Sequence, residues 1–247
     1  MIITVDIGNT NLCVAVFSDK NEPDIIRSYP DNLFYSSEEL AEELKKICPE
    51  PDGAVLCSVV PQLTQAVYSA LKSVCREDCI VIDSSFKDGL EIKGYDRKRL
   101  GNDRIADMVA AKTIYGVPAV VFDMGTATTV SVLDKDAVFI GGMIMPGMGL
   151  SINALSSGTA LLPGINPQVP RSLLGQDTVS CINNGVIFSQ ASAIEGIIDR
   201  VEKELGERVN AVVTGGAAKF VLPVTGKDVL YDEHLLLKGL KILYDNR

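Results

Sequence analysis

Two short turns combine an aspartate, a glycine and hydroxyl or amide side chains in the pattern Asp-x-Gly. The first is Asp6-Ile7-Gly8-Asn9-Thr10-Asn11, and the second is Asp123-Met124-Gly125-Thr126-Ala127-Thr128. A glycine lets the backbone approach a phosphate closely, and neighbouring N–H groups and hydroxyls can then donate to its oxygens. The aspartate adds a carboxylate for Mg²⁺. The pair predicts a clamp for nucleotide phosphates, and two β-turns with Asx-type hydrogen bonds are the alternative.

A third group of reactive side chains opens a predicted helix, at Gly101-Asn102-Asp103-Arg104. Asp103 lies in the first turn, where the helix dipole favours an anion. Such a carboxylate can orient a substrate hydroxyl and accept its proton in phosphoryl transfer. Arg104 could bind a substrate carboxylate. Asp107, one turn later on the same face, is the competing base, and helix capping with a surface ion pair is the purely structural alternative.

Two glycine-rich segments carry weaker signals. Gly141-Gly142-Met143-Ile144-Met145-Pro146-Gly147 lies in an uncharged run, which is typical of tightly packed backbone beside a ligand, at a subunit interface or in a buried turn. Thr214-Gly215-Gly216-Ala217 follows a predicted strand and would let an adenine or ribose lie against the backbone. The chain contains no GxxxxGK[ST] phosphate loop, and Gly147–Ile152 does not complete GxGxxG.

The elements that position these residues alternate between strand and helix. Residues 2–17 predict strand, glycine turn and strand, and the same pattern begins again at Ala119. This recurrence at the start of each half predicts an internal duplication, with a boundary near Gly116–Pro118 and the active cleft between the halves. Further predicted strands are 54–60, 79–83 and 209–213, and predicted helices begin at Ser36 and span 61–75, 101–115, 178–205 and 233–243.

Composition narrows the class of protein. The 247 residues are 47% hydrophobic and carry a formal net charge of −9, which predicts a sizeable core and argues against nucleic acid or an anionic membrane as the main partner. The six cysteines form no CxxC and are expected as free thiols, and the single histidine, His234, gives little support to a zinc site. The N-terminus does not resemble a signal peptide, and we expect a soluble, cytoplasmic protein.

Taken in order, these motifs resemble those of the type III pantothenate kinases, and the resemblance covers essentially the whole chain. The Asp-x-Gly-Asn-Thr opening alone is shared by many members of the actin/hexokinase/Hsp70-like superfamily, whereas the ordered set is much more specific. The matching segments are Asp6–Thr10, Gly101–Arg104, Asp123–Thr128, Gly141–Gly147 and Thr214–Gly216, together with Ser58-Val59-Val60-Pro61 and Gly175-Gln176-Asp177-Thr178.

The resemblance implies an α/β fold of two tandem ribonuclease-H-like (actin-like ATPase) lobes, 1–117 and 118–247, with a cleft between them. It implies ATP-dependent phosphorylation of pantothenate to 4′-phosphopantothenate, the first step of coenzyme A biosynthesis. It also implies Mg²⁺, a monovalent cation (K⁺ or NH₄⁺) and a homodimer with the substrate pocket close to its interface.

The resemblance further implies roles for single residues. Asp103 would accept the proton of the pantothenate hydroxyl, and Asp123 would hold the monovalent cation, while Asp6 would lie near Mg²⁺. The expected ATP-binding residues are Asp6, Ile7, Gly8, Asn9, Thr10, Asn11, Leu12, Cys13 and Thr126. The expected pantothenate-binding residues are Tyr95, Gly101, Asn102, Asp103, Arg104 and Thr178, with Arg104 facing the carboxylate.

One segment departs from the family pattern, which usually has Tyr-x-x-Pro shortly before Gly-x-Asp-Arg. Here the run Tyr95–Leu100 has no proline and one residue fewer. Tyr95 is the candidate for the pocket tyrosine, and Arg97, Lys98 and Arg99 predict a solvated loop. Two other functions stay open: a non-catalytic regulatory or ligand-binding relative, and a kinase of the same superfamily that acts on a sugar or on acetate.

Overall fold

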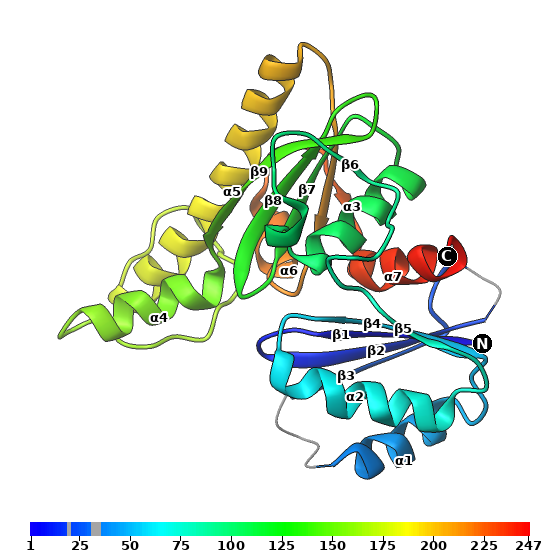
Figure 1. Cartoon of the computed structure of the whole chain (residues 1–247). Coiled ribbons are helices and arrows are strands. Elements are labelled where there is room, and N and C mark those ends of the chain that lie inside the picture. The colour runs from blue at the N-terminus through cyan, green and yellow to red at the C-terminus, as the bar shows by residue number, and fades with distance from the viewer. Residues whose placement is uncertain (19–20, 31–35) are drawn as a thin grey trace. The chain divides into compact units, whose positions relative to one another are not determined.

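The computed structural model describes residues 1–18, 21–30 and 36–247, which divide into two units (Figure 1). The first unit contains Met1–Ile114 together with His234–Arg247, and the second contains Tyr115–Glu233. The chain therefore enters the second unit after Ile114 and returns to the first at His234. The structure thus differs from the expected lobes 1–117 and 118–247, chiefly because the C-terminal helix belongs to the first unit.

The first unit is built on a sheet with the strand order β3-β2-β1-β4-β5 (Figure 1). β1 is antiparallel to β2 and parallel to β4. The two central strands, β1 and β4, are nearly continuous runs of buried residues, as expected for strands covered on both faces. The strands are β1 (Ile2–Ile7), β2 (Asn11–Phe17), β3 (Ile25–Pro30), β4 (Gly53–Ser58) and β5 (Cys79–Val81).

Two pairs of helices cover the two faces of this sheet (Figure 1). α1 and α2 pack against one another and against Ile3, Val5 and Ile7 of β1. α3 and α7 pack against one another on the other face. The helices are α1 (Ser37–Ile47), α2 (Pro61–Val74), α3 (Asn102–Ile114) and α7 (Leu235–Asp245), and the short elements are β6 (Glu91–Ile92) and the 3₁₀ turn η1 (Arg97–Arg99).

The contact between α3 and α7 explains why the C-terminal helix belongs to the first unit. A Cβ added at Gly239 would lie 2.0 Å from the carbonyl oxygen of Ala106, so only glycine lets the two helices approach this closely. Leu237 packs against Ala15 and Phe17 of β2. The sequence pattern predicted the helix but not its unit, because an amphipathic helix can cover either sheet.

The second unit repeats the plan of the first. Its strands run in the order β11-β10-β7-β8-β9, with β7 antiparallel to β8 and parallel to β10. Asp6 and Asp123 are each the penultimate residue of the central strand of their unit. This topology confirms the predicted duplication. The strands are β7 (Ala119–Met124), β8 (Ala127–Leu133), β9 (Val138–Pro146), β10 (Asn210–Thr214) and β11 (Leu230–Tyr231).

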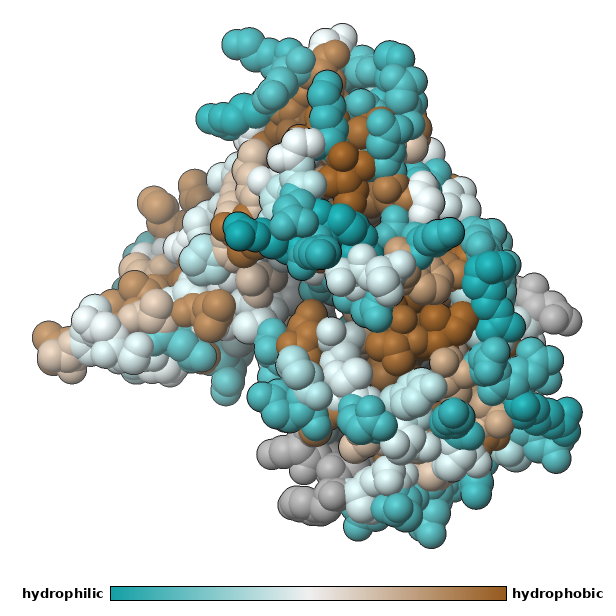
Figure 2. All heavy atoms as spheres, in the orientation of Figure 1, coloured by the Kyte–Doolittle hydropathy of each residue, from teal (hydrophilic) through white to brown (hydrophobic). Residues whose placement is uncertain are grey.

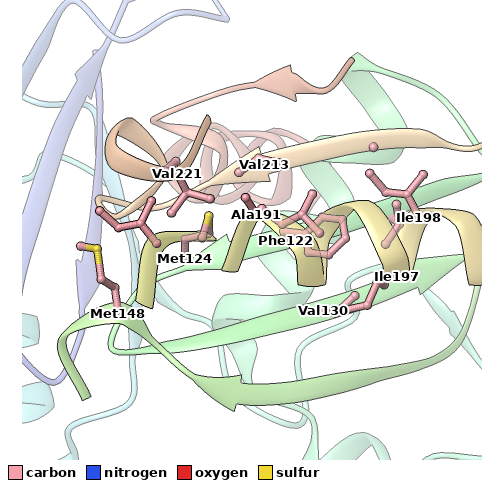
Figure 3. Close-up of a cluster of buried hydrophobic side chains, with 14 of the residues drawn as sticks. Phe122, Met124, Val130, Met148, Ala191, Ile197, Ile198, Val213 and Val221 are labelled. Atoms are coloured by element: carbon pink, nitrogen blue, oxygen red, sulfur yellow. The ribbon is translucent and has the colours of Figure 1, made fainter. Parts of the chain in front are cut away.

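One long helix, α5 (Thr178–Leu205), forms the core of the second unit with the sheet, and its bounds agree with the prediction. Ile197 and Ile198 on α5 belong to one cluster with Phe122 and Val130 of the sheet (Figure 3). The helix ends at Gly206, whose left-handed φ of 75° suits glycine. The remaining helices are α4 (Met148–Gly158), α6 (Ala218–Val221) and the 3₁₀ turn η2 (Leu222–Val224).

The uncharged segment 137–170 contains regular structure that sequence analysis did not predict. It holds β9 and α4, although its glycines argue against both in isolation. Antiparallel pairing with β8 supplies the hydrogen bonds that stabilise β9 despite its composition. Among the described residues, no helix is long and apolar enough to cross a membrane.

Candidate active site

The first Asp-x-Gly turn lies at the carboxyl end of β1. Asp6 is half-buried, and the N–H of Gly8 donates a 3.0 Å hydrogen bond to the carbonyl oxygen of Asn11, which closes the turn. Asn9 and Thr10 between them are exposed. The turn therefore presents polar groups beside a carboxylate, as a phosphate-binding turn requires.

Two other residues of the expected ATP-binding run, Ile7 and Leu12, point elsewhere. The side chains of Ile7 and Leu12 are buried in the core with α1 and α2, because the strands on each side of the turn alternate between the two faces. The Cys13 thiol donates to the Ser28 hydroxyl at 3.6 Å, and burial, more than Asp6, raises its pKa. Ile7 and Leu12 can therefore offer a ligand only their backbone, whereas Cys13, directly opposite Asp6 on β2, lies on the same face of the sheet as Asp6.

Strand alternation places Asp6 on the face of the sheet that α3 and α7 cover. Val5 and Ile7, on each side of it, point into the opposite core. The parallel register sets Asp6 directly beside Cys57 of β4. Asp6 and Cys57 therefore lie near the first turn of α3.

Three carboxylates gather around the buried Cys57. Burial and the negative charges of Asp6, Asp103 and Asp107 raise the pKa of its thiol well above the ordinary value. The thiol is fully buried and stays protonated, so it serves as an apolar spacer and not as a nucleophile. One strand and one helix thus bring their acids to one end of the first unit's sheet.

Asp103 lies in the first turn of α3 and is half-buried. Its Oδ1 accepts the backbone N–H of Arg104 at 2.8 Å. The carboxylate folds back over Gly101, where an added Cβ would lie 2.3 Å from Oδ1. Glycine at position 101 therefore leaves room for the carboxylate.

Arg104 follows on the same helix and is only 6% exposed. Burial lowers the pKa of its guanidinium, whereas Tyr95, Asp103 and Asp107 act in the opposite direction, and Tyr95 also hydrogen-bonds to it. An arginine stays protonated in such surroundings. The structure therefore brings Tyr95 and Arg104, two of the expected substrate residues, together.

In the second unit, three of the motifs meet at the end of β7. Gly215 has a φ of 91°, and a Cβ there would lie 2.6 Å from the backbone of Met124 and 2.7 Å from Oδ1 of Asp123. A Cβ at Gly147 would lie 2.3 Å from the carbonyl oxygen of Thr126, which already accepts the Gly147 N–H at 3.1 Å. Both glycine-rich segments therefore pack directly on the second Asp-x-Gly turn, and their glycines make that packing possible.

A buried amide on α5 holds this turn from behind. The Gln190 side chain donates to the carbonyl oxygen of Pro146 at 3.0 Å and accepts the Thr128 hydroxyl at 3.1 Å. Thr128 is buried, so its hydroxyl positions the turn. Sequence analysis missed Gln190, and the available signal was a polar residue on the apolar stripe of α5, between Ile187 and Ile194.

Two further motifs of the family pattern start helices. Asp177 accepts the N–H of Ser180 at 2.9 Å and caps α5, so the exposed Thr178 is the first residue of that helix. Ser58 accepts the hydroxyl of Thr64 at 2.8 Å and so holds the turn between β4 and α2. These hydrogen bonds give Asp177 and Ser58 structural roles.

The candidate residues are thus distributed over both units. The first unit brings together Asp6, Asp103 and Arg104, and the second carries Asp123 and Thr126 on one turn. In the described part of the chain, no group of three or more His, Cys, Asp or Glu residues could hold a metal. A Mg²⁺ ion held by one or two carboxylates plus substrate phosphates fits this set, whereas a cage made only of protein ligands does not.

Comparison with known proteins decides the family. The sequence model of the type III pantothenate kinases matches residues 2–200. The chain belongs to this family. A type III pantothenate kinase of Dictyoglomus turgidum is 38% identical over 99% of this chain and 98% of its own length. That of Moorella thermoacetica is 33% identical over 99% of both chains.

Solved structures agree on the fold. A Sinorhizobium meliloti protein described as a 2-dehydro-3-deoxygalactonokinase superposes with a TM-score of 0.64 at 12% identity, covering 100% of this chain and 96% of that one. The expected α/β fold with two ribonuclease-H-like lobes is confirmed. In this chain, the run after Tyr95 still brings that tyrosine to Arg104.

Proposed function

We propose that this chain transfers the γ-phosphoryl group of ATP to the hydroxyl of pantothenate, the first step of coenzyme A biosynthesis. The observation that carries the proposal is the gathering of Asp6, Asp103 and Arg104 at one end of the first unit's sheet. These residues offer a carboxylate for the phosphate side, a carboxylate for the hydroxyl and a cation for an acidic substrate. Membership of the type III pantothenate kinase family supports the same reaction.

Asp103 is the proposed proton acceptor. The pantothenate oxygen attacks the γ-phosphorus, the bond to the bridging oxygen of ADP breaks, and the hydroxyl proton passes to Asp103. Because Oδ1 of Asp103 is engaged by the Arg104 N–H, we assign the proton to Oδ2. A carboxylate acting late in the transfer needs position more than basicity.

Arg104 and Tyr95 are proposed to bind the carboxylate of pantothenate. A guanidinium can donate two parallel hydrogen bonds to a carboxylate. The Arg104 guanidinium is largely buried, so it gives up few contacts with water when it binds the substrate. Gly101, Asn102 and Thr178 complete the proposed substrate-binding set. A sugar, which has no carboxylate, would offer the guanidinium no anionic group to bind.

The turn at Asp6–Asn11 is proposed to bind the phosphates of ATP. In the second unit, Thr126 is proposed as an ATP-binding residue. Asp6 would hold Mg²⁺, which supplies charge neutralisation for the transferred phosphoryl group. Asp123 is proposed to hold a monovalent cation, K⁺ or NH₄⁺. Its carboxylate lies against Gly215, at a turn fixed by glycine contacts on two sides, which supports a binding role over a mobile surface acid.

We further propose a homodimer formed through the second unit. Leu161, Leu173 and Leu174 are 90%, 63% and 72% exposed. Figure 2 shows apolar side chains over the end of this unit that carries α4. An apolar surface of this kind marks a protein contact. The six free thiols suit a reducing compartment, and the cytoplasm is the proposed location.

The test is release of ADP from ATP and Mg²⁺ with and without pantothenate, run in parallel in K⁺ and in Na⁺. We expect release that depends on pantothenate and increases with K⁺. Equal rates of ADP release in both salts would contradict the monovalent-cation site at Asp123. That result would not affect the proposed kinase activity. Pantothenate binding by calorimetry without turnover would instead favour the non-catalytic relative. Sedimentation of Leu173→Glu beside the parent chain tests the dimer.

A further inference from the structure

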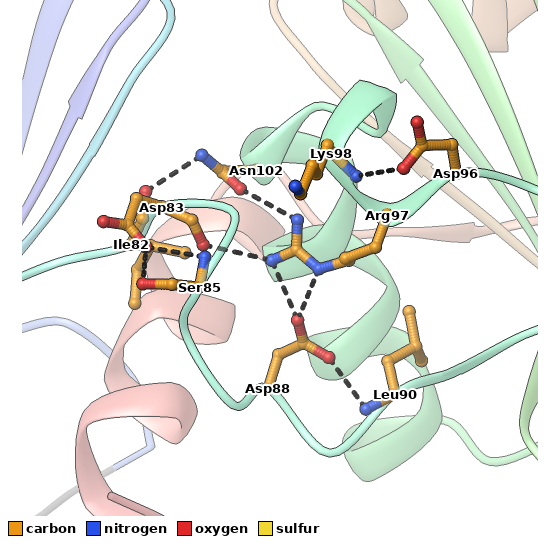
Figure 4. A network of polar contacts seen from close by, with 9 residues as sticks. All are labelled: Ile82, Asp83, Ser85, Asp88, Leu90, Asp96, Arg97, Lys98 and Asn102. Carbon is orange, nitrogen blue, oxygen red and sulfur yellow. Dashed lines mark hydrogen bonds and ion pairs between the residues drawn. The ribbon is translucent and has the colours of Figure 1, made fainter.

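The segment between Tyr95 and Asp103 is held by a half-buried arginine, contrary to the solvated loop that sequence analysis expected. The Arg97 guanidinium contacts one oxygen of Asp88 from two nitrogens, with Nε–Oδ2 at 3.0 Å and Nη2–Oδ2 at 2.9 Å (Figure 4). The side chain of Asp88 is 5% exposed and that of Arg97 is 22% exposed. By contrast, the side chain of Arg99 is 83% exposed.

The same guanidinium joins two further parts of the unit. Nη1 of Arg97 donates to Oδ1 of Asn102 at 3.3 Å, and Nη2 donates to the carbonyl oxygen of Asp83 at 3.3 Å. The Asn102 amide in turn donates to the carbonyl oxygen of Ile82 at 2.9 Å. As Figure 4 shows, one arginine thereby links the chain that follows β5 to the first residue of α3.

Asp88 is itself fixed by the backbone. Its second carboxylate oxygen accepts the N–H of Leu90 at 2.8 Å. A buried ion pair with its remaining lone pairs satisfied holds a definite geometry, and the loss of one partner leaves a buried charge uncompensated. The pair therefore fixes the backbone at Arg97 more firmly than the two exposed basic residues after it can.

Position in the sequence connects this pair to the substrate residues. Tyr95 lies two residues before Arg97, and Asn102 lies directly before Asp103. The pair thus controls the stretch of chain whose two ends must bring the Tyr95 phenol to the Arg104 guanidinium. Neither Arg97 nor Asp88 needs to touch a substrate for this effect.

We propose that the Arg97–Asp88 ion pair is a positioning device that sets the Tyr95–Arg104 contact and thereby the affinity for the acidic substrate. The proposal rests on the proposed function for the identity of that substrate. It assigns Arg97 and Asp88 to substrate binding through other residues, and it leaves the proton step to Asp103.

The test compares Arg97→Lys and Arg97→Met with the matched control Arg99→Met. Lysine keeps the charge but cannot present two nitrogens to one carboxylate oxygen in the same planar geometry. We expect KM for pantothenate to rise about tenfold in Arg97→Met and less in Arg97→Lys, with KM for ATP and kcat within about twofold of the parent. Arg99→Met should match the parent, and thermal unfolding checks that each variant is folded.

A double-mutant cycle with Tyr95→Phe identifies the route. If Arg97 acts through Tyr95, the two effects on KM will be less than additive. Unchanged KM in the folded Arg97→Lys and Arg97→Met proteins overturns the proposal, and so does an equal effect on both substrates. Failure of the parent chain to phosphorylate pantothenate would count against the proposed function alone, because pantothenate binding by calorimetry still compares the variants.

Discussion

The phenol of Tyr115 donates a 2.9 Å hydrogen bond to the carboxylate of Asp232. Tyr115 is the first residue of the second unit, and Asp232 lies next to its last residue. The bond therefore joins the places where the chain enters and leaves this unit. Asn210 supports the same point, because its side chain donates to the Tyr115 carbonyl oxygen at 3.0 Å.

The first prediction concerns this bond. Asp232 is 5% exposed, so Tyr115→Phe leaves a buried carboxylate with one donor fewer. We expect the free energy of unfolding to fall by about 1–2 kcal/mol, measured by urea titration. Tyr231→Phe is the matched control, since that side chain is 43% exposed and its loss should change little. Equal midpoints for the two variants would contradict the role given to Tyr115.

Asp103→Asn tests the proton acceptor. The amide keeps the shape of the side chain but cannot take the hydroxyl proton, so we expect kcat to fall by roughly a hundredfold or more. ATP binding, followed by calorimetry, should be unchanged because Asp103 does not serve the phosphate turn. Asp136→Asn, at an exposed acid of the second unit, should keep full activity. Full turnover in the Asp103 variant would remove this residue from the mechanism.

Gly101→Ala separates catalysis from stability. The new Cβ would overlap Oδ1 of Asp103, and that flexible side chain can rotate away at little cost. We expect nearly unchanged unfolding but a kcat lowered about tenfold or more, because the carboxylate loses its position. An added Cβ at Gly185 meets nothing within 4 Å, so Gly185→Ala should retain the parent kcat. A strong loss of stability in Gly101→Ala would show that the backbone, and not Asp103, gives way.

Gly215→Ala should have the opposite signature. Its φ of 91° and the 2.6 Å approach to the Met124 backbone leave no flexible neighbour to move. We expect a loss of about 2–3 kcal/mol in unfolding free energy, together with displacement of Asp123 and loss of any K⁺ dependence. Gly216→Ala, next in the chain, meets nothing within 4 Å and is the matched control. Equal stability of the two variants would contradict this account.

Tyr29 is expected to make the stability of the folded chain depend on pH. Burial, followed by the charge of Glu43, raises the pKa of Tyr29 from 10.0 to about 12, and its hydroxyl donates to Glu43 at 3.1 Å. A raised folded-state pKa means that this contribution is complete below pH 10 and is lost between pH 10 and 12. We expect a loss of about 1 kcal/mol over that range after allowance for solvent screening. Tyr29→Phe should flatten the curve, and an unchanged slope would assign the effect elsewhere.

Local signals in the sequence were enough to predict much of the fold. The cap at Asp177 and the αL glycine at Gly206 bracket α5, so both of its ends were predictable. The repeated Asp-x-Gly turns predicted two sheets of one topology, which the structure confirms. The acids Asp6 and Asp103 and the carboxylate-binding candidate Arg104 were also found from residue type and spacing, although their roles stay predictions.

Long-range partners set the limit of such predictions. From sequence alone, Arg97 is one of three basic residues in a predicted loop, because its partner Asp88 contacts it only in the folded unit. From sequence alone, Gln190 is one polar residue of a long helix. Its amide gains its role from hydrogen bonds to Thr128 of β8 and Pro146 of β9, which only the fold brings to it. The packing of Gly239 on Ala106 joins the C-terminal helix to a helix near the middle of the chain, and no local pattern predicts that contact.

The contact between Gly239 and Ala106 has a consequence for the order in which the two units fold during synthesis. The ribosome makes α3 before the whole second unit and makes α7 after it. The second unit, continuous in sequence, can therefore fold on the nascent chain while the first is still incomplete. The helix that carries Asp103 receives its packing partner last, so a chain interrupted within the final helix would contain every proposed site residue and still lack the support that holds its acid in place.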